Sequence, residues 1–459
     1  MNEATLDFIR QHADDDVRRL ALQGAKNPEV DLTWALDQIA GRQQARTKLP
    51  TWAATDGIIY PPHLSMEQCS SEQTARYKAN ILSHDRPFTT SHSRLSLIDL
   101  TGGFGVDFAF MAQAFSLLYP PTSLHLTYVE QNEQLCRCAA HNFPLLGIRD
   151  VQVVCGDATE VLRKTSHATV VYMDPARRDR QGARTYDIRD CMPNVLALKE
   201  ELQAKADCVL LKLSPMLDWR KAVSDLGQEW VREVHIVSVG NECKELLVVL
   251  KGEKVEEDAL RVVCVNIAPS KPLLEAPSKP PPVGEAYGAQ TFHYGVVWSD
   301  GADKKLPLQG EVLALQATKG QAWRGLFLYE PNASIMKAGC FDALSVQYGL
   351  SPLSANSHLF ISPDSIENFP GRSFKISAVS SINKRDLKDA LAGIRQANIT
   401  VRNFPMSVAD IRRRLKLADG GDTYIFATTL ADGSHVLLIC QKVSRTLKKD
   451  KASQNNCEL

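Results

Sequence analysis

The stretch at residues 97–107, LIDLTGGFGVD, constrains the fold of this chain more than any other. It begins as an apolar, β-branched run that reaches an acid, Asp99. Three glycines, Gly102, Gly103 and Gly105, follow before a helical pattern starts. Glycines let a ligand approach the backbone closely, and the N-terminus of a helix offers free N–H groups. A strand, a glycine turn and a helix in this order predict a nucleotide-binding turn in an α/β sheet.

The segments that follow this turn alternate between short apolar runs and helical patterns. Continuous apolar strands are typical of a parallel sheet whose two faces are covered by helices. The predicted strands are Leu95–Leu100, Leu124–Glu130, Val151–Cys155, Thr169–Met173, Cys208–Leu213 and Val234–Val239. Two later runs, Leu246–Leu250 and Leu260–Ile267, have no long helix between them and predict an antiparallel hairpin at one edge. We therefore expect an α/β fold with a doubly wound, Rossmann-like sheet.

The length of 459 residues exceeds what one ordinary core holds, so several domains are expected. Helical patterns without good strands occupy the N-terminal region, and a proline-rich stretch predicts a stiff linker. Beyond the linker, strands and helices mix as in α+β modules. The expected segments are a helical region at 1–84, the Rossmann-like domain at 85–268, the linker at 269–284, α+β modules at 285–372 and 373–445, and a disordered tail at 446–459.

Composition excludes several classes of protein. The formal net charge is zero, so a nucleic-acid-binding surface would have to be local. No window approaches the roughly 20 apolar residues of a membrane span, and the acidic N-terminus does not look like a signal peptide. We expect a cytoplasmic protein with no membrane partner. The 11 cysteines form no CxxC pair and no Cys/His cluster, so no metal site is expected.

The glycine turn itself favours one kind of ligand over another. A dinucleotide fingerprint would need a third glycine where Phe108 stands. An acid before the glycines is also unfavourable beside a pyrophosphate, whereas it suits a ligand with a cationic end. The amino group and sulfonium of S-adenosylmethionine (SAM) meet that description. A tight turn with a purely structural role is the alternative.

Acids recur at the ends of the next three strands: Glu130 in TYVEQN, Asp157 in VVCGDAT and Asp174 in VVYMDPAR. This order resembles the motifs of class I SAM-dependent methyltransferases, over residues 65–252. The resemblance implies that Glu130 binds the ribose hydroxyls and that Asp157 faces the adenine amino group. The implied cofactor is SAM, and the implied cofactor-binding residues are Asp99, Thr101, Gly102, Gly103, Gly105, Glu130, Asp157, Ala158 and Asp174.

The run at 67–79 resembles the segment that covers the methionine end of SAM in such enzymes. Ser71, Thr74 and Tyr77 would then contact the methionine carboxylate or close the pocket. A plain N-capped helix is the alternative for this run.

The motif at Asp174 bears on the chemistry. In methyltransferases that act on exocyclic amines of nucleobases this position resembles D-P-P-Y, whose acid orients the target amine. Here Ala176 and Arg177 replace the second proline and the aromatic residue. A guanidinium can stack on a base or hold a phosphate. Uracil-5 methyltransferases show D-P-P-R but also need a nucleophilic cysteine, and this chain offers Ser214 after the next strand. Asp174 and Arg177 are the predicted catalytic residues.

Clusters of arginine predict contacts with RNA. Arg178 and Arg184 lie in the loop after Asp174, and Arg402, Arg412 and Arg413 lie in and near a basic C-terminal helix. Arginine pairs with phosphate through two parallel hydrogen bonds. Charged segments exposed to solvent, without a ligand, are the alternative for both.

The runs LFLYEPNASIMKAG at 326–339 and VRNFPMSVADIRRRLKLADGGDTYIFA at 401–427 carry a further resemblance. They are similar to bacterial methyltransferase-like proteins with a ferredoxin-like module and a C-terminal THUMP-like domain. This implies that 285–372 is ferredoxin-like and 373–445 THUMP-like. THUMP domains are associated with tRNA-modifying enzymes. The expected function is SAM-dependent methylation of a nucleobase in structured RNA, with tRNA as partner. The alternatives are an RNA-binding protein with a non-catalytic SAM pocket, or a methyltransferase for proteins or small molecules.

Overall fold

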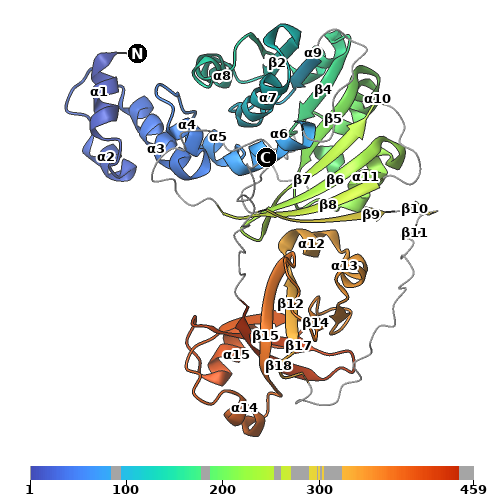
Figure 1. The fold of residues 1–459 in the computed structure, drawn as a ribbon. Coiled ribbons are helices and arrows are strands. Elements are labelled where there is room, and N and C mark those ends of the chain that lie inside the picture. The colour runs from blue at the N-terminus through green and yellow to red at the C-terminus, as the bar shows by residue number, and fades with distance from the viewer. Residues whose placement is uncertain are drawn as a thin grey trace, which may run out of the picture. The chain divides into compact units, whose positions relative to one another are not determined.

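The computed structural model describes residues 2–83, 95–176, 187–252, 260–269, 289–296, 298–299, 302–303 and 323–443. Contacts divide the chain into two units, Met1–Ala302 and Asp303–Leu459 (Figure 1). Of the expected linker, only the first residue, Pro269, is among the described residues. The expected tail lies entirely outside them. The domain boundaries expected from the sequence therefore stay predictions.

The N-terminal region is helical, as expected. Its helices are α1 (Glu3–Gln11), α2 (Val17–Gln23), α3 (Leu32–Lys48), α4 (Pro50–Ala53), α5 (His63–Gln68) and α6 (Glu72–Ser83). Asp16 and Asp31 start α2 and α3 because their carboxylates accept hydrogen bonds from N–H groups of the first turn. The side chain of Asn142 bonds both the N–H and the C=O of Ile59, which ties this region to the sheet domain. No helix of the described residues is long and apolar enough to cross a membrane.

The first unit is built on a nine-stranded sheet of order β3-β2-β1-β4-β5-β7-β6-β8-β9. The first five strands are parallel, and the order reverses between β1 and β4, so the predicted doubly wound sheet is confirmed. The strands are β1 (Leu95–Asp99), β2 (Leu124–Glu130), β3 (Val151–Cys155), β4 (Ala168–Met173), β5 (Ala206–Leu213), β6 (Val231–Val239), β7 (Glu242–Lys251), β8 (Leu260–Ile267) and β9 (Gln290–Val296). The helices among them are α7 (Val106–Leu118), α8 (Glu133–Leu145), α9 (Ala158–Lys164), α10 (Val195–Lys205) and α11 (Trp219–Leu226).

The predicted hairpin between Leu246–Leu250 and Leu260–Ile267 is wrong. The antiparallel hairpin is formed one strand earlier, by β6 and β7, and β7 inserts between β5 and β6. The reason lies in the turn: Gly240 and Asn241 have φ of 57° and 68°, which suits a two-residue hairpin turn. Strand β8 then pairs in parallel with β6. Strand β9, in a segment that the sequence placed in the ferredoxin-like module, pairs with β8 at the edge of this sheet.

The second unit contains a seven-stranded sheet of order β13-β14-β12-β15-β18-β17-β16. Its strands are β12 (Phe327–Pro331), β13 (Ser351–Pro352), β14 (Phe360–Ser362), β15 (Gly371–Ser380), β16 (Asn398–Arg402), β17 (Thr423–Thr429) and β18 (His435–Lys442). Its helices are α12 (Ala333–Ala338), α13 (Phe341–Tyr348), α14 (Lys384–Ala390) and α15 (Val408–Leu415), while β10 (Trp298–Ser299) and β11 (Ala302–Asp303) form a separate ribbon. The expected α+β character is confirmed, and β12 pairs with β15, so both expected modules share one sheet.

Candidate functional site

The glycine turn at the carboxyl end of β1 is fixed to the neighbouring strand β2. Asp99 ends β1, and its carboxylate accepts a hydrogen bond of 2.9 Å from the N–H of Thr101. The N–H of Gly102 donates to the C=O of Val129 at 2.8 Å. The N–H of Gly103 donates to Oε2 of Glu130, also at 2.8 Å. The turn therefore has a defined shape that depends on the acid at the end of β2.

The three glycines serve different purposes. A Cβ on Gly102 would lie 2.1 Å from the ring of Tyr128, and one on Gly105 would lie 2.9 Å from the ring of Phe143. Only glycine fits at these two positions, because aromatic rings pack directly against the backbone there. Gly103 has a φ of 56°, and the nearest atom to its Cβ would be 4.0 Å away. Gly103 thus leaves open space at the turn, as an approaching ligand needs.

Asp99 is a buried acid among other acids. Its exposed fraction is 1%. Burial raises the pKa of this carboxyl well above its usual value, and the carboxylates of Asp107, Asp174 and Glu130 raise it further. Within the described residues no cationic side chain forms an ion pair with Asp99. A ligand that placed a positive charge here would relieve this repulsion.

Glu130 and Asp157 lie at the ends of the adjacent strands β2 and β3, and both carboxylates also hold the backbone. The two carboxylate oxygens of Glu130 accept hydrogen bonds from the N–H groups of Gly103 and Asn132, each at 2.8 Å. Asp157 caps α9 through two N–H groups of its first turn, and its other oxygen accepts from Gln131 at 2.8 Å. A carboxylate has about four lone-pair sites, so both acids keep capacity for a ligand. Ala158, the first residue of α9, is buried.

Asp174 follows β4, and its N–H donates to the hydroxyl of Thr101 at 2.6 Å. This bond joins the DPAR motif to the glycine turn, because the carboxyl ends of β1 and β4 meet at the same edge of the sheet. The side chain of Asp174 is 38% exposed, and its Oδ2 lies 2.5 Å from Nζ of Lys212, on β5. The structure thus brings Asp99, Thr101 and Asp174 together.

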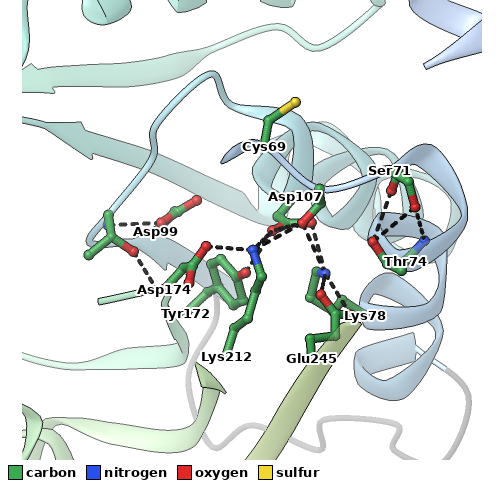
Figure 2. Close-up of polar contacts among 12 residues, drawn as sticks. Cys69, Ser71, Thr74, Lys78, Asp99, Asp107, Tyr172, Asp174, Lys212 and Glu245 are labelled. Carbon is green, nitrogen blue, oxygen red and sulfur yellow. Dashed lines mark hydrogen bonds and ion pairs between the residues drawn. The ribbon is translucent and has the colours of Figure 1, made fainter. Parts of the chain in front are cut away.

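The sequence did not predict a chain of alternating charges that runs inward from Asp174 (Figure 2). Lys212 lies 2.5 Å from Asp174 and 3.8 Å from Asp107, on α7. Lys78, on α6, is fully buried and lies 3.2 Å from Asp107 and 2.7 Å from Glu245, on β7. We call Asp174, Lys212, Asp107, Lys78 and Glu245 the charge chain. Three acids and two lysines give it a net charge of −1.

Two hydroxyls complete the centre of the charge chain. Tyr172 donates to Oδ2 of Asp107 at 2.7 Å, and Ser70 donates to the same oxygen at 2.8 Å. Burial raises the pKa of Asp107, but the two lysines and these hydroxyls outweigh it, and the net shift is downward. Burial lowers the pKa of Lys212, but Asp174 and Asp107 outweigh it, and the net shift is upward. Asp107 and Lys212 are therefore both ionised.

Several predicted contacts have partners inside the chain. Tyr77 is hydrogen-bonded to His235 at 2.8 Å, and Ser71 and Thr74 bond each other at the start of α6. Arg402 pairs with Glu330 at 2.8 Å, Arg412 with Asp419 at 2.6 Å and Arg413 with Asp410 at 3.4 Å. Arg177, Arg178 and Arg184 lie outside the described residues. In the described ranges, no group of three or more His, Cys, Asp or Glu side chains could hold a metal ion.

Comparison with known proteins finds matches to both parts of the chain. Residues 327–370 match the model of a ferredoxin-like domain, and residues 371–442 match that of a THUMP domain-like family. No curated protein matches. The crystal structure of a candidate methyltransferase from Porphyromonas gingivalis W83 is 28% identical, with a TM-score of 0.72 over 96% of this chain and 98% of that one.

A candidate class I SAM-dependent methyltransferase from Listeria monocytogenes is 12% identical, with a TM-score of 0.36 over 60% of this chain and 95% of that one. The resemblance implied by the sequence is confirmed: the chain is similar over nearly its whole length to a candidate methyltransferase and carries ferredoxin-like and THUMP-like segments.

Proposed function

We propose that this chain transfers the methyl group of SAM to a nucleobase of structured RNA, with tRNA as the RNA class. The observation that carries the SAM part is Asp99, a buried acid beside an open glycine turn with other acids around it. Such a site favours a ligand with a positive charge and opposes a pyrophosphate. The Porphyromonas structure, described as a candidate methyltransferase, supports the same reaction.

The residues present fit SAM along the edge of the sheet. Asp99 would face the cationic methionine end, and the open side of Gly103 would admit the ligand. Glu130 would accept from the ribose hydroxyls with its remaining lone pairs. Asp157 and the N–H of Ala158 would meet the adenine. SAM supplies the methyl group, and the protein contributes mainly alignment, because methyl transfer is an in-line displacement.

The acceptor would lie on the other side of Asp174. Lys212 fixes one carboxylate oxygen of Asp174, so the other oxygen can accept a hydrogen bond in a defined direction. Met192 exchanges two backbone hydrogen bonds with Ala176, two residues after Asp174, and Met216 follows β5, the strand that pairs with β4. Both methionine side chains are exposed. Exposed apolar side chains at the edge of the sheet where Asp174 lies would suit a flat base.

The RNA part of the proposal rests on the THUMP-like match at 371–442 and on the association of THUMP domains with tRNA-modifying enzymes. A second candidate is an RNA-binding protein whose SAM site does not catalyse. The contact between Asp174 and Lys212 favours it, since a carboxylate engaged by a lysine has less capacity for an acceptor. The two candidate functions differ in whether the methyl group is transferred from SAM to an acceptor.

The test is transfer of labelled methyl groups from SAM to total RNA, DNA and protein fractions by the full chain. We expect label in RNA. Asp174→Asn should abolish transfer and leave the Kd for SAM within about tenfold, because Asp174 acts on the acceptor. Glu130→Ala should weaken SAM binding by about 1–3 kcal/mol. Asp190→Asn, an exposed acid in the same region, is the matched control.

Label in protein alone would contradict the RNA proposal. SAM binding without transfer to any fraction would favour the second candidate. Loss of SAM binding in Asp174→Asn would show that Asp174 holds the donor instead of the acceptor.

A further inference from the structure

A cluster of ion-paired residues lies on one face of the seven-stranded sheet, outside the site described above. Glu330, at the end of β12, is 2% exposed. Its Oε2 accepts from Nε of Arg372 at 2.7 Å, and its Oε1 accepts from a terminal nitrogen of Arg402 at 2.8 Å. Two guanidinium groups thus share one buried carboxylate. The excess charge of the three side chains is +1.

Strand register places these side chains on one face of the sheet. Arg372 pairs with Glu330 across β15 and β12, and Arg402 pairs with Thr428 across β16 and β17. In the sheet order, three strands separate β12 from β16. A flat sheet would hold them about 19 Å apart, at about 4.8 Å per strand. Register also places Arg372 level with the Lys442 end of β18 and Arg402 level with its Val436 end. The ion pair between Arg402 and Glu330 therefore requires a strongly curved sheet with a concave face.

Three buried polar atoms in this region have no partner within the described part of the chain. They are Nδ2 of Asn332, Nε of Arg402 and Oγ1 of Thr428. The first two can only donate a hydrogen bond, and the hydroxyl can donate as well. Asn332 and Thr428 are both almost fully buried. Buried donors without partners are costly, so their concentration at one place calls for an acceptor.

We propose that Glu330, Asn332, Arg372, Arg402 and Thr428, here called the Glu330 cluster, form a binding site for a single phosphate group. The donors come from the residue just beyond β12, from β15, and from β16 with β17, so they approach from different directions. A phosphate presents several acceptor oxygens in a tetrahedron, whereas a carboxylate presents two in one plane. Arginine also pairs with phosphate through its planar fork.

Access and charge fit this assignment. The side chains of Arg372 and Arg402 are 40% and 33% exposed, so part of each can be reached from solvent. Glu330 holds the two guanidinium groups together while the site is empty, and a phosphate competes with it for them. The source is an RNA strand or a free nucleotide. The site does not depend on the proposed methyl transfer.

The test is calorimetric titration of the full chain without SAM, with three probes: inorganic phosphate, AMP, and a 5′-phosphorylated RNA oligonucleotide. We expect phosphate to bind, and Arg402→Gln to weaken that binding about tenfold or more, a loss typical of one charged contact. Arg395→Gln is the matched control, because Arg395 is an exposed arginine of the same unit that lies outside the Glu330 cluster. Its affinity should stay within about twofold of the unmodified chain. Arg372→Gln replaces Arg402→Gln if the latter does not fold.

Glu330→Gln separates a phosphate site from a structural ion pair. In a phosphate site the variant binds phosphate more tightly, because the competing carboxylate is gone. In a structural ion pair the variant loses stability and gains no affinity. Failure of both the unmodified chain and Glu330→Gln to bind phosphate would overturn the proposal. Tighter binding of the oligonucleotide than of AMP assigns the site to RNA, and the reverse order assigns it to a nucleotide. Neither result depends on methyl transfer. Failure of the proposed function would appear in the transfer assay with labelled SAM and not in these titrations.

Discussion

Replacing Lys78 with methionine tests how the charge chain is held inside the protein. Lys78 is fully buried and neutralises two carboxylates, Glu245 at 2.7 Å and Asp107 at 3.2 Å. In Lys78→Met three acids share one lysine, Lys212, and the net charge of the chain changes from −1 to −2. Methionine fills a similar volume, so the loss is mainly electrostatic.

The expected loss in the free energy of unfolding follows from the burial of Lys78 and its partners. Removing one partner of a buried ion pair typically costs about 3–5 kcal/mol, because it leaves an uncompensated charge. Glu245→Gln should cost less, about 1–3 kcal/mol, because Lys78 then keeps Asp107 as its partner. In a double variant with methionine at both Lys78 and Glu245, neither buried charge remains. Its cost should fall well below the sum of the two single variants.

The pH dependence has a definite sign. Burial already raises the pKa of Glu245, although Lys78 and Lys212 oppose it, and loss of Lys78 raises that pKa further. An acid whose folded pKa is raised contributes stability that is lost as pH rises from its unfolded pKa of about 4.3 through the folded value. The deficit of Lys78→Met should therefore be larger at pH 8 than at pH 5.

The assay is urea unfolding followed by circular dichroism, at both pH values, for the unmodified chain and the three variants. A deficit below about 1 kcal/mol for Lys78→Met would refute the reasoning, since that is the range of an exposed pair. So would a double variant whose cost equals the sum of the single ones.

Two further outcomes follow from the glycine turn. In Asp99→Asn, the ligand-free protein should be more stable than the unmodified chain at pH 8, with a smaller difference near pH 4. The raised pKa of Asp99 makes its contribution to stability fall as pH rises from about 4. Urea unfolding at several pH values is the measurement, and a variant less stable than the unmodified chain at pH 8 would contradict the prediction. Gly102→Ala should lower the melting temperature because its Cβ would lie 2.1 Å from the ring of Tyr128. Gly295→Ala is the control, because Gly295, like Gly102, has no positive φ and its Cβ would meet nothing within 4 Å. Calorimetry of the two variants therefore measures the clash at Gly102 apart from the other effects of an added methyl group.

The sequence predicted the sheet well where strands are apolar and continuous. The bounds of Leu124–Glu130 and Val151–Cys155 agree with the structure at both ends. Strand β2 lies inside the sheet and buries four consecutive residues, so its limits are visible as a run, whereas the edge strand β3 is marked by its β-branched valines. The pairing of later strands was not visible in this way. The turn at Gly240 and Asn241 decided which strands form the hairpin, and the lengths of the apolar runs do not contain that information.

The charge chain was missed for a different reason. Lys212 and Glu245 interrupt apolar strands, and Lys78 lies on the inner face of α6 with Ala75 and Leu82. Each interruption was a signal that a buried charge needs a partner. The partner could not be identified, because Lys78 and Glu245 are 167 positions apart in the chain. Only the packing of α6 against the sheet brings them together.

The hydrogen bonds between β12 and β15 also determine whether the ferredoxin-like and THUMP-like segments can exist apart from each other. The ferredoxin-like match ends at residue 370 and the THUMP-like match begins at 371, yet Leu328 and Phe374 are paired neighbours in one sheet. Separation at that boundary would expose two long interior strand edges, which favour aggregation. The two segments should therefore melt in a single transition and persist in relatives as an inseparable pair, so gene rearrangements that keep one would also keep the other.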